Sequence, residues 1–277
     1  MKLAPALEKR KNMSRRLLFG TNWKMHKTIR EAREYASRFR DLLGAIERID
    51  TALIFVIPPF TAIDVVRQES RNKFRVGAQN MHWAEWGPYT GEISAPMLKD
   101  LGVEIVQLGH AERRQLFHES NSEINRKVQM ALRHGLRPLI CVGEDENERN
   151  FHIERETIAK QLRVALHELP ANSASQIILA YEPFWAIGDN GVTAEPSYVR
   201  EMTNFCRNVL SDLFGATATD EVPIIYGGSV NASAAPRFLM ESHSDGVFVG
   251  RVALDPEAFA ELIRVCLQSV GANSLRP

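Results

Sequence analysis

The stretch Ala180-Tyr181-Glu182-Pro183-Phe184-Trp185-Ala186-Ile187-Gly188 places a carboxylate directly after an apolar run of strand length, Gln176 to Tyr181. Pro183 follows at once and prevents the strand from continuing. Bulky apolar side chains and then glycine come next, which is typical of a loop that closes over a ligand and excludes water. A surface glutamate opening an ordinary connection is the other interpretation that this stretch allows.

The same succession of apolar run, polar loop and helix-period segment recurs along the whole chain. The apolar runs are Leu17–Phe19, Ala52–Ile57, Phe74–Ala78, Ile105–Leu108, Pro138–Val142, Ile177–Ala180, Ile224–Tyr226 and Gly246–Val249. The helix-period segments are Ile29–Leu43, Ala62–Gln68, Ala95–Leu101, Glu123–His134, Glu154–Glu168, Ser197–Phe214, Ala232–Met240 and Glu257–Val270. Strand followed by helix, repeated without a break, predicts an α/β fold with a single (β/α)₈ barrel. A doubly wound open sheet is the alternative, weakened because no G-x-G-x-x-G follows the first run.

Composition limits the possible functions. The chain has 277 residues with a formal net charge of +0, so nothing indicates nucleic acid or an acidic membrane as a partner. No apolar run has the length of a membrane span, and the charged N-terminus lacks the apolar core of a secretory signal. The three cysteines form no CxxC pair, which favours reduced thiols and a cytoplasmic protein without a metal site. We expect residues 1–16 to be a flexible extension and residues 17–277 to form the barrel.

Caps support several of the predicted helix starts, namely Thr28, Thr61, Ser94 and Asn231. In a barrel of this kind, function lies at the carboxyl ends of the strands. Polar residues do collect there. They are Thr21 to Lys24 after the first strand, Gln79-Asn80 and Gly87 to Glu92 after the third, Gly109 to Arg114 after the fourth, Gly143-Glu144 after the fifth, Glu182 after the sixth, Gly227-Gly228-Ser229 after the seventh and Gly250-Arg251 after the eighth.

Two of these groups suit an anionic, phosphorylated substrate. Lys24 lies two residues after Asn22, so both are expected to point the same way, and an ammonium there suits a developing oxyanion. A solvated surface lysine is the alternative for Lys24. Gly227-Gly228-Ser229, ahead of a helix start, lets backbone N–H groups approach a phosphate, and Gly250 on the next loop would complete a two-loop cup. A glycine pair that only marks a turn is the alternative.

His110 and Glu182 suit proton transfer. His110 stands at the start of a helical turn, followed by Glu112 and two arginines, and the helix dipole and these positive charges should lower its imidazole pKa. A packed or capping histidine is the alternative. A neutral imidazole can still donate a hydrogen bond to a carbonyl, while Glu182 removes a carbon-bound proton. Together with Lys24 this predicts proton abstraction next to a carbonyl through an enediol-like intermediate.

At this point the chain resembles the triosephosphate isomerase family. The motifs that carry the resemblance are Asn22-Trp-Lys-Met25, Gly77-Ala-Gln-Asn80, Thr90-Gly-Glu92, Leu108-Gly-His-Ala-Glu-Arg-Arg114, Cys141-Val-Gly-Glu144, Tyr181 to Gly188, Tyr226-Gly-Gly-Ser-Val230 and Asp245-Gly246 with Val249-Gly250. They occur in the family's order, at matching spacing, over nearly the whole chain after the extension.

The resemblance implies a role for each matched position. Glu182 is expected to be the base and His110 to be the electrophile and proton shuttle, a pair whose pKa values are tuned in a known way. Lys24 is expected to supply the positive charge that faces the substrate, with Asn22 assisting at the oxyanion. Glu112 is expected to be the carboxylate that supports them. Gly188, Ser229 and Gly250 are expected to bind phosphate, with Arg251 beside them. Pro183, Phe184, Trp185, Ala186 and Ile187 are expected to belong to the lid, and Thr90 to reach into the partner subunit of a homodimer. No metal or organic cofactor is implied.

Departures from the family pattern concern the walls of the site. Ala111 replaces the usual serine, His26 the common asparagine, Arg251 the second glycine of a pair, and Gly188-Asp-Asn-Gly-Val192 the usual Gly-Thr-Gly-Lys. With Asn80 to Ala84, the last two resemble a branch that converts L-erythrulose 1-phosphate to D-erythrulose 4-phosphate. The expected activity is therefore an aldose–ketose isomerase of this family acting on that four-carbon substrate. An ordinary triosephosphate isomerase of glycolysis and a non-catalytic sugar-phosphate-binding barrel are the alternatives.

Overall fold

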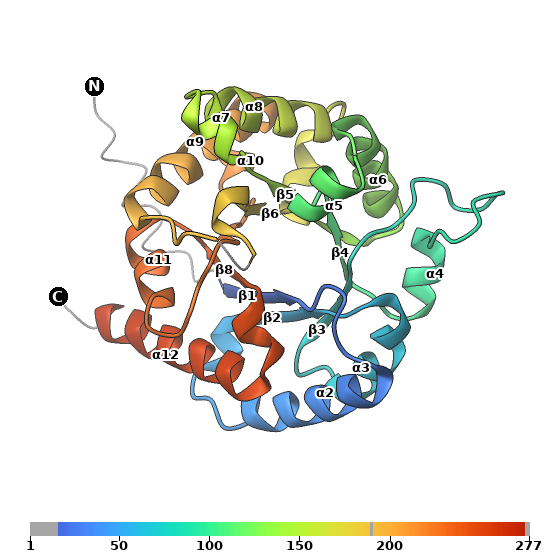
Figure 1. The fold of residues 1–277 in the computed structure, drawn as a ribbon, viewed down its shortest axis with the longest axis vertical. Coiled ribbons are helices and arrows are strands. Elements are labelled where there is room, and N and C mark those ends of the chain that lie inside the picture. Colours follow the sequence, from blue (N-terminus) through green and yellow to red (C-terminus); the bar gives the residue numbers. More distant parts are fainter. Residues whose placement is uncertain (1–15, 189–190, 275–277) are drawn as a thin grey trace.

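Eight parallel strands close into a barrel in the computed structural model, which describes residues 16–188 and 191–274. Each strand pairs with the next along the chain, and β8 returns to pair with β1 (Figure 1). The strands are β1 (Leu17–Asn22), β2 (Ala52–Ile57), β3 (Arg75–Ala78), β4 (Ile105–Leu108), β5 (Arg137–Val142), β6 (Ile178–Tyr181), β7 (Ile224–Tyr226) and β8 (Gly246–Val249). The predicted fold class is confirmed, and every predicted strand is present.

Helices form a ring around the barrel (Figure 1). The α-helices are α2 (Ile29–Leu43), α3 (Ile63–Ser70), α4 (Ala95–Asp100), α5 (Ala111–Leu116), α6 (Asn121–Arg133), α7 (Glu146–Asn150), α8 (Glu154–Ala165), α9 (Pro196–Phe214), α10 (Ala216–Thr219), α11 (Ala235–Glu241) and α12 (Pro256–Ser274). Short 3₁₀ helices are η1 (Ile49–Thr51), η2 (Phe60–Ala62), η3 (Ala171–Gln176), η4 (Phe184–Ala186) and η5 (Arg251–Leu254). Helices α7 and α10 were not predicted, because segments of 5 and 4 residues are too short to show a helical period.

The predicted caps are only partly correct. Thr28 forms a capping box with Glu31 at the start of α2. Ser94 occupies the N-cap position of α4, but its hydroxyl makes no capping hydrogen bond. Thr61 lies inside η2, and Asn231 caps a turn several residues before α11 begins. A side-chain cap depends on the backbone angles at one residue, which a sequence pattern does not fix.

The strands separate two apolar layers. One layer fills the barrel interior, where Leu18, Phe55, Leu139, Ile178 and Phe248 pack together. The other lies between the strands and the surrounding helices. Successive side chains of a strand point to opposite faces, so each strand supplies both layers. Because each strand is packed on both faces, its ends are held rigidly. The residues of the candidate site stand at these strand ends.

The structure also bears on the predictions about membrane-spanning helices, the cysteines and the N-terminal extension. In the part of the chain that the structure describes, no helix has the length and apolar character needed to cross a bilayer. Cys141, Cys206 and Cys266 are free and buried, as the sequence predicts. The barrel begins at Leu17, while the extension lies, apart from Arg16, outside the described residues.

Candidate active site

Glu182 is the residue immediately after β6, and its backbone N–H donates to the Val142 carbonyl at 2.8 Å. This bond fixes the residue to the end of β5, and its side chain is buried inside the rim of the barrel. Gly227 lies against it, and a Cβ at that position would be 2.6 Å from Glu182 Cγ. Glycine at 227 is therefore required by the close approach of the carboxylate. One oxygen, Oε2, is buried without a hydrogen-bond partner, so it is available to accept a proton.

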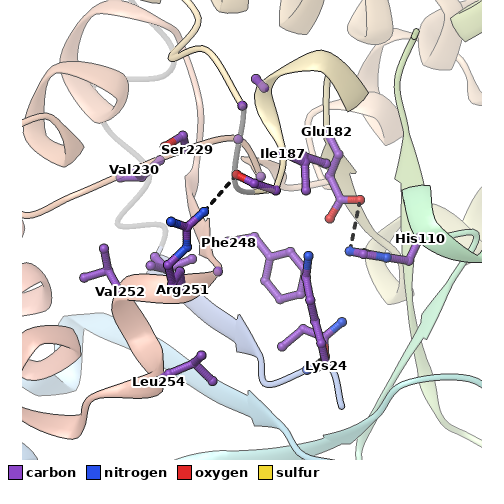
Figure 2. Close-up of a pocket in the computed structure, with 18 of the residues that line it drawn as sticks. Lys24, His110, Glu182, Ile187, Ser229, Val230, Phe248, Arg251, Val252 and Leu254 are labelled. Atoms are coloured by element: carbon purple, nitrogen blue, oxygen red, sulfur yellow. Dashed lines mark hydrogen bonds and ion pairs between the residues drawn. The ribbon is translucent and has the colours of Figure 1, made fainter. Parts of the chain in front are cut away.

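His110 faces this carboxylate from the end of β4. It is the N-cap of α5, and its Nδ1 accepts the backbone N–H of Glu112 at 3.2 Å. That bond places the proton of the neutral imidazole on Nε2. Nε2 lies 4.0 Å from Oε2 of Glu182, too far for a direct hydrogen bond and close enough for both to contact one ligand (Figure 2).

Burial sets the protonation of both groups. It raises the pKa of Glu182 to about 8, partly offset by the Cys141 thiol, the Lys24 ammonium and the Ala111 backbone. It also lowers the pKa of His110 to about 4, and Lys24 and Arg113 act in the same direction against the opposing charge of Glu112. The direction predicted for His110 is confirmed, but its main cause is burial rather than the helix dipole and neighbouring charges. The site thus combines a base of raised pKa with an imidazole that is neutral at neutral pH.

Lys24 brings a positive charge to the same cavity. Its Nζ lies 2.5 Å from Oε1 of Glu112, and its backbone N–H donates to Asn22 Oδ1 at 2.7 Å. Lys24 lies beyond the end of β1 with φ of 54°, so strand alternation is not what aligns it with Asn22. Both still line the pocket, while Glu112 supports the ammonium from outside it. Of the residues on either side of Lys24, Trp23 is buried and Met25 is exposed.

The predicted phosphate-binding residues line the opposite side of the cavity, which has a volume of about 490 Å³. They are Gly188, Ser229, Gly250 and Arg251. Figure 2 shows Arg251 and Ser229 on this side, Glu182 and His110 on the other, and the Phe248 ring between them. Arg251 Nη2 donates to the Gly188 carbonyl at 2.9 Å, and the Ser229 N–H donates to the Ala186 carbonyl at 3.0 Å. Both donors are therefore engaged by the loop after β6.

That loop contains the predicted lid residues Pro183 to Ile187. Trp185 Nε1 donates to Oε1 of Glu144 at 2.8 Å, which also accepts the Tyr198 hydroxyl. Arg149 stacks on the Trp185 ring with its guanidinium carbon 3.9 Å from the centroid. Ala186 and Ile187 line the cavity. Pro183, Phe184 and Trp185 precede them in the loop and link the cavity wall to the contacts with Glu144 and Arg149. Asp189 and Asn190, which the sequence marks as a departure, lie outside the described residues.

Sequence reasoning missed several contributors to the site. Glu144 was noted as a strand-end residue without a role, yet it holds Trp185. Phe248 lies in an apolar strand, where nothing distinguishes a cavity wall from an ordinary core residue. Gln107 carried a usable signal, because it interrupts the apolar run Ile105–Leu108 with an amide that the structure buries.

The fold and this site define the chain as a barrel enzyme that isomerises sugar phosphates. The family model described as triosephosphate isomerase matches residues 17–266. The chain belongs to the triosephosphate isomerase family.

Relatives carry two different names. The chain is 42% identical over 259 residues to an L-erythrulose-1-phosphate isomerase of Rhizobium rhizogenes, covering 91% of this chain and 95% of that protein. It is 41% identical over 260 residues to a protein of that name from Brucella abortus, covering 92% and 98%. A triosephosphate isomerase of Alkaliphilus oremlandii is 40% identical over 250 residues, covering 90% and 99%.

Proposed function

We propose that the protein converts L-erythrulose 1-phosphate to D-erythrulose 4-phosphate. The observation that carries the chemistry is the pair of Glu182 Oε2 and His110 Nε2, 4.0 Å apart at the rim of a cavity that Lys24 also lines. A carbon-bound proton beside a carbonyl could meet the base there while the carbonyl oxygen meets the imidazole N–H. The substrate assignment rests on the names of two relatives and on Arg251 at the phosphate side of the cavity.

The reaction is a proton transfer between adjacent carbons. Glu182 removes the proton from the hydroxyl-bearing carbon next to the ketone, and the electron pair moves to the carbonyl oxygen, giving an enediolate. Lys24 and Asn22 stabilise the oxyanion, and His110 donates its Nε2 proton to one oxygen and recovers a proton from the other. Protonated Glu182 then returns its proton to the former carbonyl carbon. Atoms balance without a cofactor.

The extra carbon changes the class of the product. In the three-carbon reaction one partner, glyceraldehyde 3-phosphate, carries an aldehyde, so the reaction joins an aldose and a ketose. In D-erythrulose 4-phosphate a hydroxymethyl group replaces the hydrogen of that aldehyde, so substrate and product of the four-carbon reaction are both ketoses. The expectation of an aldose–ketose isomerase therefore describes the three-carbon alternative, whereas the proton transfer is common to both.

Phosphate binding in this proposal requires a change at the loop after β6. Backbone N–H groups at Gly188, Ser229 and Gly250, with the Arg251 guanidinium, would hold the phosphate. The Ser229 N–H is occupied by the Ala186 carbonyl, so that bond must open or be shared when phosphate binds. The lid and the phosphate cup are thereby coupled, since one donor serves both.

Comparing kcat/KM on L-erythrulose 1-phosphate and on glyceraldehyde 3-phosphate tests the substrate. We expect the four-carbon substrate to be preferred by at least about tenfold, the low end of what one extra carbon provides in a fitted pocket. A preference of the same size for glyceraldehyde 3-phosphate would instead assign the chain as a triosephosphate isomerase. Turnover of neither would leave a sugar-phosphate-binding barrel as the explanation.

The homodimer and the cytoplasmic location are further parts of the proposal. The loop between β3 and α4, which contains Thr90, projects from the helix ring (Figure 1). Trp86 on that loop and Leu116 and Phe117 on α5 and just after it are exposed apolar side chains that a partner subunit would cover. Sedimentation of wild-type protein and of a Phe117→Glu variant tests this proposal, which expects the variant alone to be monomeric. The cytoplasmic location stays a prediction from the reduced cysteines.

A further inference from the structure

Gln107 is a polar residue in the apolar interior of the barrel. It lies on β4 two residues after Ile105, and both face inward by strand alternation. Its side chain is completely buried. An amide in such a place is destabilising unless its oxygen and nitrogen both have partners. The partners that Gln107 has are both next to the reacting groups.

The oxygen end of Gln107 holds Asn22. Oε1 of Gln107 accepts a hydrogen bond from Asn22 Nδ2 at 2.8 Å. The other end of the Asn22 amide, Oδ1, accepts the backbone N–H of Lys24 at 2.7 Å. Lys24 has φ of 54°, in the left-handed region that non-glycine residues rarely occupy. Gln107 therefore fixes the amide that in turn holds the unusual backbone of Lys24.

The nitrogen end of Gln107 holds Cys141. Nε2 of Gln107 donates to Cys141 Sγ at 3.3 Å. Burial keeps this thiol protonated, since it raises the cysteine pKa well above its ordinary value. Cys141 lies next to Glu182, and its thiol favours the ionised form of that carboxylate. With its sulfur accepting from Gln107, the thiol has its proton available for the carboxylate.

We propose that Gln107 is a positioning residue for the isomerisation, joining the oxyanion side of the site to the base side through the chain Asn22, Gln107, Cys141 and Glu182. Asn22 donates to Gln107 and Gln107 donates in the same direction to Cys141, whose thiol lies next to Glu182. Bonds that run in one direction through a dry interior polarise one another. Gln107 touches no substrate and acts through its neighbours. The inference rests on the proposed isomerase function.

The test is Gln107→Met, which keeps a side chain of similar length and removes both hydrogen bonds. We expect kcat to fall roughly tenfold or more, the effect of losing one well-placed hydrogen bond in the transition state, with KM within about twofold. Affinity for phosphoglycolate, whose carboxylate resembles the enediolate, should fall about as much as kcat. Affinity for glycerol phosphate, which has no such group, should stay within about twofold.

If Gln107 only stabilised the fold, the kinetic and binding results for Gln107→Met would differ from those above. If Gln107→Met weakens the binding of both probes equally, or leaves kcat within about twofold of wild type, the positioning role is wrong. Ser242→Ala is the matched control. It likewise removes a buried polar group, here a hydroxyl that bonds to the Phe238 carbonyl and to Ser244 just before β8, at the opposite end of the barrel. It should lower the unfolding temperature without changing kcat.

Cys141→Ala supplies a second variant if Gln107→Met does not fold. It breaks the same chain with a smaller side chain, and kcat should again fall; an unchanged kcat contradicts the proposal. Where both single variants fold, their combined effect should be smaller than the product of the single effects, because they interrupt one chain. Wild-type protein inactive on both sugar phosphates would contradict the isomerase function itself. Active wild type with an equally active Gln107→Met contradicts only the positioning role.

Discussion

The pocket has two sides that differ in how their polar groups are held. On the side of β1, β4 and β6, Asn22, His110 and Glu182 are buried, and the half-buried Lys24 is paired with Glu112. On the side of β7 and β8 the donors are on Ser229 and Arg251, which are exposed and bond to carbonyls of the loop after β6.

This difference matches two tasks. In the proposed reaction, proton transfer needs protonation states that only a dry, fixed environment supplies, which suits groups at rigid strand ends. A phosphate must enter and leave, which suits the exposed position of the proposed donors at Ser229 and Arg251. The chemistry should therefore be sensitive to small changes on the buried side, and substrate preference to changes on the exposed side.

The largest expected effect comes from the buried side. Glu182→Gln keeps the shape of the side chain and removes the base, so kcat should fall by about a thousandfold, within the range for a general base. The protein should fold and still bind glycerol phosphate, because the substitution replaces a buried acid with a neutral group. Steady-state kinetics and a binding titration measure both. Turnover close to that of wild type would show that the barrel works without this base.

Glu112→Gln should have the next largest effect. It removes the ion pair with Lys24, and a displaced ammonium can lower kcat/KM by up to about a hundredfold. The unfolding temperature should hardly change, since a half-exposed pair contributes about 1 kcal/mol or less. Kinetics with a thermal melt separate the two effects. Arg264→Gln, which breaks an exposed pair with Glu261 on α12, is the control and should affect neither.

Arg251→Gly tests the exposed side. We expect the ratio of kcat/KM for the four-carbon substrate to that for glyceraldehyde 3-phosphate to fall about tenfold, because the cup loses a charged donor and gains space. kcat on the three-carbon substrate should change little, since no group of the buried side is altered. An unchanged ratio would show that Arg251 does not shape specificity and holds only the lid carbonyl of Gly188.

The smallest expected effect is on the pH dependence of stability. The pKa of Glu182 is raised from 4.5 to about 8, so the folded state binds this proton more tightly than the unfolded chain does. Its contribution is present at pH 4.5 and below and is lost as pH rises through about 8, by at most about 1.4 kcal/mol per pH unit. The lowered pKa of His110 acts in the opposite direction, because it makes the folded protein more stable as pH rises. This gain in stability is complete above pH 6.5.

Denaturant unfolding of wild type and Glu182→Gln between pH 6.5 and about 8 isolates the carboxyl. Wild type should lose stability over this interval relative to the variant. Parallel curves would mean that the carboxyl is not held protonated by burial. The activity of wild type should rise over the same interval, since the base acts as a carboxylate.

Much of the barrel could be predicted because the repeat of apolar run and helix period is local. The ends of β2, β4, β7 and β8 agree with the sequence, and β1 begins at Leu17, as its predicted strand does. The cap at Thr61 was wrong, and Ser94 stands at the N-cap position without the capping hydrogen bond, because a cap depends on a rotamer and on backbone angles at a single residue. The sequence placed Glu182, His110 and Lys24 at strand ends, and the structure brings them to one cavity, while their roles in the reaction stay predictions.

The sequence by itself determined the strand order and the polar residues that gather at the carboxyl ends of the strands, since these follow from local periodicity and motif spacing. Only the tertiary structure decided how the groups behave. The pKa values of His110 and Glu182 are set by burial, which depends on residues distant in the sequence. The link from Asn22 through Gln107 to Cys141 crosses three strands, and the bond between Arg251 and Gly188 spans two loops. Contacts of this kind exist only when the barrel closes.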